Sequence, residues 1–191
     1  MDISKVAVIY DTLYLMGEFQ SLKEFIFSRR FSGQEKQGLL GFIKNKQTVY
    51  HDPRSLFAVI EIVPTEVLEE LDDQKAVGPQ KLAANLLKDG ALRVDLAQDT
   101  VVSSMMPQSA TDKQIGLYAQ RLVSFATRER YALAVIATEN NELLTALADL
   151  AKKGKDVFGV KSQDLVRTRL LHDKLTEIAN RGRSNPVVME N

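Results

Sequence analysis

The chain has 191 residues, 45% hydrophobic and 26% charged, and its 25 basic and 25 acidic side chains give a net charge of zero. These values are typical of one globular domain with a sizeable core. The absence of cysteine excludes disulfides, thiolate catalysis and cysteine-ligated zinc. It is compatible with a reducing compartment, so we expect a cytoplasmic protein. No apolar run reaches the roughly 18 residues that span a membrane. The first short apolar run of the chain ends at Asp11, which is unlike a secretory signal.

Short apolar runs recur along the chain and predict strands. The first run, residues 6–10, ends at an acid, and residues 57–63 form either a strand or the end of a helix that leads into a short strand. Further candidates are residues 92–96, 133–137 and 157–160. Continuous apolar runs are typical of strands that are covered on both faces, as in parallel sheets.

Helical patterns lie between these runs. Thr111 and Gln114 match a capping box, and apolar residues recur behind them at helical spacing. Residues 141–153 carry leucines at helical spacing, and Gly154 predicts the end of that helix. Residues 162–181 predict a C-terminal helix. Strands that alternate with helices indicate an α/β fold with right-handed crossovers.

Polar and acidic side chains follow several of the predicted strands. In parallel α/β sheets, functional groups gather beyond the carboxyl ends of the strands. Asp11 directly follows the first strand, and Thr138, Glu139 and Asn140 directly follow another. Asp112 lies in the first turn of its helix. Plain structural roles remain open, because Asp11 could cap the next helix and Asp112 suits the positive end of a helix.

Glu70 is distinguished from its neighbours by helix geometry. Steps of about 100° per residue place Glu70 at the edge of the apolar stripe of its helix and place Glu66 and Glu69 nearly opposite that stripe. The stripe consists of Val67, Leu68 and Leu71. We therefore expect Glu70 to point into a cleft and Glu66 and Glu69 to face solvent. Pairing of Glu70 with Lys75 is an alternative.

The charge distribution is uneven despite the neutral total. Residues 23–54 are rich in lysine and arginine, whereas residues 61–99 are acidic. An acidic centre with basic flanks suits a metal site that also holds a polyanion, although ordinary solvated faces would give the same pattern. The candidates for contacting a nucleic-acid backbone are Arg29, Arg30, Lys44 and Lys46, with Phe31 and Phe42 as stacking faces or as core residues.

Several other site classes fit less well. The two histidines, His51 and His172, form no zinc-binding motif, although either could act as a general base or simply pack at the surface. Haloacid-dehalogenase-like phosphatases need a second Asp two residues after the first, where this chain has Leu13. Residues 38–41 do not supply a phosphate-binding P-loop, and a response-regulator receiver needs a different order of acids.

Four segments resemble, in order, the motifs of the PIN-domain nucleases. Residues 8–12, Val-Ile-Tyr-Asp-Thr, resemble the opening strand with its Asp-Thr pair. Residues 62–72 closely resemble the second motif, including its Val-Leu-x-Glu-Leu core. Residues 112–115 match the third motif, an acid followed by an apolar residue three places on, and residues 136–143 match the fourth in outline. The resemblance covers about residues 5–160.

The resemblance implies a three-layer PIN-like α/β fold with a central, mostly parallel sheet flanked by helices, plus the C-terminal helix. We expect a PIN-like domain over residues 1–160, with a basic insertion at about 21–55, and a C-terminal helix and tail over 161–191. The implied activity is that of a metal-dependent endoribonuclease that uses Mg²⁺ or Mn²⁺ and a metal-activated water to cleave single-stranded RNA. A homodimer and an antitoxin-like protein partner both remain open.

Carried over position by position, the resemblance also implies the site residues. The implied catalytic residues are Asp11, Glu70, Asp112, Thr138 and Asn140. The implied metal ligands are Asp11, Glu70, Asp112, Asn140 and Glu142.

Position 140 departs from the family, which usually has Asp there. Asn140 brings no charge, and Glu142 in the same first turn could supply it, whereas Glu139 could do so only if the loop turned it inward. Asn140 also predicts an ordinary helix cap. The departure favours an alternative function, a PIN-like module that binds RNA or a protein without cutting.

Overall fold

The computed structural model describes residues 4–17, 21–22, 57–96 and 112–162, together with 164, 167, 170, 171, 173–175, 177 and 178. The side chains of Phe57, Asp112 and Lys113 are not described. The predictions for the basic segment 23–54 lie outside the described residues. The same holds for those made for His51 and His172.

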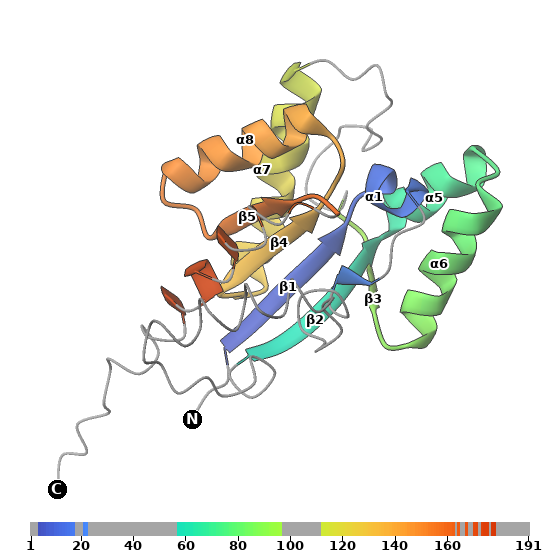
Figure 1. Ribbon diagram of the computed structural model, residues 1–191, viewed down its shortest axis with the longest axis horizontal. Coiled ribbons are helices and arrows are strands. Elements are labelled where there is room, and N and C mark those ends of the chain that lie inside the picture. The colour runs from blue at the N-terminus through green and yellow to red at the C-terminus, as the bar shows by residue number, and fades with distance from the viewer. Residues whose placement is uncertain are drawn as a thin grey trace, which may run out of the picture.

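A five-stranded parallel sheet forms the centre of the molecule (Figure 1). Its strand order is β3-β2-β1-β4-β5, so β1 lies in the middle and pairs with both β2 and β4. The strands are β1 (Ser4–Tyr10), β2 (Phe57–Pro64), β3 (Leu92–Val94), β4 (Leu133–Ala137) and β5 (Val157–Val160). The predicted α/β fold with a parallel sheet is confirmed, and residues 57–63 belong to a strand.

Helices cover both faces of this sheet and make a three-layer structure (Figure 1). The helices are α1 (Thr12–Met16), α5 (Thr65–Asp73), α6 (Val77–Lys88), α7 (Asp112–Arg128) and α8 (Asn141–Lys152). Helices α7 and α8 pack on one face, while α1, α5 and α6 pack on the other. Leu171, Leu175 and Ile178, which have helical backbone in the C-terminal segment, join the second group.

The two faces of β1 supply alternate residues to two separate cores. Val6, Val8 and Tyr10 face α1, α5 and α6, whereas Ala7 and Ile9 face α7 and α8. All five side chains are fully buried. This explains why the run is continuously apolar, because successive side chains of a strand point to opposite faces and both faces are covered.

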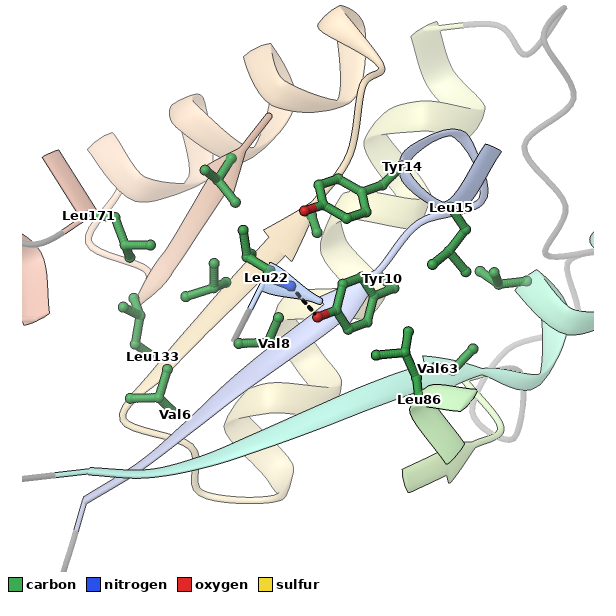
Figure 2. Close-up of a cluster of buried hydrophobic side chains, with 14 of the residues drawn as sticks. Val6, Val8, Tyr10, Tyr14, Leu15, Leu22, Val63, Leu86, Leu133 and Leu171 are labelled. Atoms are coloured by element: carbon green, nitrogen blue, oxygen red, sulfur yellow. Dashed lines mark hydrogen bonds between the residues drawn. The ribbon is translucent and has the colours of Figure 1, made fainter. Parts of the chain in front are cut away.

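Tyr10 lies in the apolar core, where its hydroxyl meets the backbone N–H of Leu22 (Figure 2), and it also belongs to a small polar network. Its hydroxyl accepts a 2.7 Å hydrogen bond from the backbone N–H of Leu22 and donates a 2.8 Å bond to the buried carboxylate of Glu61 on β2. The hydroxyl of Ser21 also donates to that carboxylate. Glu61 is therefore a buried acid with hydrogen-bond partners, and this network holds Ser21 and Leu22 against the sheet.

Local signals account for both ends of helix α8. Helix α8 begins after Asn140, whose side chain caps it, and the chain leaves it through Gly154 at a positive φ of 81°. The apolar pattern of the sequence did not predict helix α6. This helix tolerates Pro79 because the proline lies in its first turn, where its missing N–H is not needed. Among the helices of the described ranges, none combines the length and the apolar character that crossing a bilayer requires.

Candidate active site

The carboxyl ends of β1 and β4 bring two polar residues side by side. Tyr10 pairs with Ala137 at the last position of the two strands. The backbone N–H of Asp11 then donates to the carbonyl of Ala137 at 2.9 Å, and the N–H of Thr138 donates to the carbonyl of Val160 on β5 at 3.0 Å. Asp11 and Thr138 thus leave the sheet at the same level.

Thr138 holds the carboxylate of Asp11. Its hydroxyl donates a 2.7 Å hydrogen bond to Oδ2 of Asp11 and accepts a 3.1 Å bond from the backbone N–H of Asn140. Asp11 is 4% exposed and Thr138 is fully buried. Because the hydroxyl is engaged on both sides, its proton points toward the carboxylate.

Glu70 reaches the same edge from α5. Its Oε2 accepts a 2.5 Å hydrogen bond from the hydroxyl of Thr12, the residue that follows Asp11, and its Oε1 accepts a 3.3 Å bond from Gln74. The Glu70 side chain is 7% exposed. Asp11 and Glu70, 59 positions apart in the printed sequence, are therefore joined through Thr12.

The electrostatics of this pair favour a bound cation. Burial, and to a smaller extent the negative charge of Glu70, together raise the pKa of Asp11 from 3.8 to about 6 against the opposing effect of the hydrogen bond from Thr138. Burial also raises the pKa of Glu70 against the effect of its bond from Thr12. Two carboxylates whose ionisation is disfavoured by burial are stabilised as anions when a cation lies beside them.

Glu66 corrects the expectation drawn from helix geometry. It was placed among the solvent-facing residues of α5, yet it is 6% exposed, whereas Glu69 is exposed as expected. Its Oε1 accepts a 2.9 Å hydrogen bond from the backbone N–H of Leu96, in the chain that leaves β3. The segment after β3 therefore packs over a side of α5 that lies outside its apolar stripe, and this contact buries Glu66.

Tyr118 on α7 is a buried residue within electrostatic range of the acids. Burial raises the pKa of its hydroxyl well above the usual value, and the charges of Asp11, Glu66 and Glu70 raise it further. In sequence, Tyr118 belongs only to the apolar stripe of its helix. No local signal distinguishes it, because its relation to the acids depends on how α7 packs across the sheet.

The remaining predicted residues occupy separate positions. Asp112 is the first residue of α7, so its backbone is placed although its side chain is not described. Asn140 accepts a 3.0 Å hydrogen bond from the backbone N–H of Leu143 and caps α8. Glu142 is exposed in the first turn of α8. Oε1 of Glu139 accepts a 2.8 Å bond from the N–H of Ser162, which ties it to the chain beyond β5.

The donors at this edge suit a hard divalent cation, which prefers oxygen ligands. Asp11 and Glu70 are brought together, and both are buried carboxylates with raised pKa values. Within the described ranges, no group of three or more histidine, cysteine or acidic side chains is arranged to hold a metal ion. The side chain of Asp112, which is predicted to be a further ligand, lies outside that description.

Comparison with known proteins assigns no chemistry to this site. No family model, curated protein or solved structure matches the chain.

Proposed function

We propose that this protein is a divalent-metal-dependent endoribonuclease that acts on single-stranded RNA. One observation supports this above all: Asp11 and Glu70 are buried together at the carboxyl edge of a parallel sheet, and each is held by a threonine hydroxyl. Parallel α/β sheets bind their ligands at this edge. The choice of RNA as the substrate rests on the resemblance of the four motifs to the PIN-domain nucleases.

In this proposal Asp11, Glu70 and Asp112 hold Mg²⁺ or Mn²⁺. Such an ion, when bound, activates a water and stabilises negative charge on the phosphate that is cleaved. Thr138 keeps the carboxylate of Asp11 oriented, and Thr12 does the same for Glu70. Both hydroxyls donate their protons to the carboxylates, so they favour the anionic forms that ligation requires.

The proposal is tested by incubating the purified full chain with an end-labelled single-stranded RNA in Mn²⁺, in Mg²⁺ or in EDTA. Cleavage should require the metal. Asp11→Asn should lower the rate by roughly a hundredfold or more, in line with the loss of a group that stabilises charge in a transition state. Asp73→Asn, which changes an exposed acid on α5, is the matched control and should cleave normally. Equal cleavage by the wild-type and Asp11→Asn proteins would contradict the proposal.

A non-catalytic RNA-binding module is the second candidate, and it is favoured by the contacts of Asn140. The Oδ1 atom of this residue is used in capping α8, and the residue brings no charge to the site. The same assay separates the two functions. Retention of the labelled RNA on the protein, with no cleavage in either metal, would identify the binding module.

A further inference from the structure

Two basic side chains stand at opposite edges of the sheet, on either side of the acids. Arg93 lies on β3 and Lys161 directly follows β5, and these strands are the two outer strands of the sheet. Asp11 follows the central strand, and adjacent strands lie about 4.8 Å apart. Each outer strand is therefore roughly 10 Å from the acidic centre, measured across the sheet.

Arg93 is placed at the carboxyl end of the sheet by a specific contact. Its Nε donates a 3.3 Å hydrogen bond to the hydroxyl of Thr65, the first residue of α5 and the neighbour of Glu66. A guanidinium group carries five N–H donors, and this bond uses one of them. The side chain is exposed and makes no ion pair with any described carboxylate, so its terminal nitrogens remain available for a bidentate contact with phosphate.

Lys161 occupies the corresponding position at the other outer strand. It follows Val160, whose carbonyl accepts a hydrogen bond from the backbone N–H of Thr138, so the chain leaves β5 beside the site threonine. It is partly exposed and likewise makes no ion pair with a described carboxylate. The nearby Arg167, in contrast, is paired with Asp164.

We propose that Arg93 and Lys161 bind phosphates of the substrate strand on the two sides of the cleaved linkage. The strand then crosses the carboxyl edge of the sheet from β3 to β5, with the scissile phosphate above Asp11 and Glu70. This inference rests on the proposed nuclease function and adds the path of the substrate. Cations at the flanks offset the repulsion that a polyanion meets at the acids.

The first test measures RNA binding without divalent metal in the Asp11→Asn background, which prevents cleavage. Arg93→Ala and Lys161→Ala should each raise the dissociation constant roughly tenfold. Each should also lower the slope of log affinity against log salt by about 0.7, the value for one phosphate contact on a single strand. Fluorescence anisotropy of a labelled RNA measures both quantities.

Matched controls come from the end of the sheet where the strands begin, which is opposite to the carboxyl ends that hold the acids. Arg128→Ala removes an exposed arginine at the end of α7, near the start of β4, and Lys155→Ala removes an exposed lysine just before β5. Each control changes the net charge by the same amount as its test variant. Both should leave affinity and salt slope nearly unchanged, because neither side chain lies on the proposed path of the RNA. A general charge effect would instead appear equally in the control and test variants.

The second test locates the contacts along the RNA. Uncharged methylphosphonate linkages are introduced one at a time, and each is combined with Arg93→Ala or Lys161→Ala in a double-mutant cycle. Arg93 should couple to a linkage on one side of the cleavage position, and Lys161 should couple to a linkage on the other. Coupling of both residues to the same side would overturn the proposed path.

The outcomes also separate this inference from the function on which it rests. If the wild-type protein cleaves RNA while Arg93→Ala and Lys161→Ala behave like their controls, the inference is wrong and the nuclease function stands. If the wild-type protein shows no metal-dependent cleavage, the nuclease function is wrong and the inference falls with it.

Discussion

The hydroxyl of Thr138 donates a 2.7 Å hydrogen bond to the carboxylate of Asp11, a residue 127 positions earlier in the chain. The two residues meet because β1 and β4 are neighbours in the sheet and end at the same level. The same hydroxyl accepts the backbone N–H of Asn140, so the start of α8 fixes its orientation. One buried threonine thus connects the candidate acid, the strand end and the cap of the next helix.

The burial of Asp11 predicts that Asp11→Asn stabilises the metal-free protein at neutral pH. The pKa of Asp11 rises from 3.8 to about 6 on folding, so the folded protein retains a proton that the unfolded chain has released. Wild-type stability should therefore fall as pH rises through this window and carry a penalty of about 3 kcal/mol above it. Asparagine has no such penalty and can still accept the bond from Thr138.

Urea unfolding in EDTA measures this effect. The Asp11→Asn protein should be more stable than the wild type by up to about 3 kcal/mol at about pH 8, and the difference should disappear near pH 4. Added Mn²⁺ should stabilise the wild-type protein and have little effect on the variant. A variant that is less stable than the wild type at both pH values would show that the Asp11 carboxylate is not strained by burial.

Metal binding should weaken in acid because protons compete for the same oxygens. Asp11 has a pKa of about 6 and the pKa of Glu70 is also raised, so Mn²⁺ affinity should fall as pH drops below about 6. Thr138→Val removes a hydrogen bond that favours the Asp11 anion and should move this decline to higher pH, whereas Thr138→Ser should keep the wild-type profile. Calorimetric titrations across pH measure the shift, and overlapping profiles for the wild-type and valine proteins would contradict it.

The buried position of Glu66 predicts a structural cost for its removal. Glu66→Ala leaves the backbone N–H of Leu96 without the acceptor that it has in the folded chain, and it should lower the free energy of unfolding by about 1–3 kcal/mol. Glu69→Ala, on the exposed side of the same helix, should change stability by less than about 0.5 kcal/mol. Amide exchange at Leu96 should accelerate only in the Glu66 variant. Equal effects of the two substitutions would mean that the contact with Leu96 is not stabilising.

Position 140 separates helix capping from metal binding. Asn140→Ala should destabilise the protein by about 1 kcal/mol through the lost cap, whereas Asn140→Asp should retain the cap and place a negative charge at a favourable helix end. If the fourth motif is aligned correctly, Asn140→Asp should also tighten Mn²⁺ binding and leave RNA cleavage equal or higher. Unchanged metal affinity in a calorimetric titration would place this residue outside the metal shell.

The sequence by itself determined the central sheet and much of its surroundings. Residues 6–10 and 133–137 are continuously apolar because each is covered on both faces, and this composition alone predicted buried parallel strands. Asp11 and Thr138 were placed at strand ends by the same signal. The start of α8 at Asn140 and the turn at Gly154 also followed from local residue preferences.

Only the tertiary structure decided which side chains surround the acids. Helical periodicity gives the direction of Glu66 relative to its own helix, but its burial depends on the chain beyond β3 packing over it. The effect of the Asp11 and Glu70 charges on the pKa of Tyr118 likewise depends on how α7 crosses the sheet. Periodicity is a property of one element, whereas burial and pKa are set by every segment that excludes water from a group, so neither could be obtained from local sequence alone.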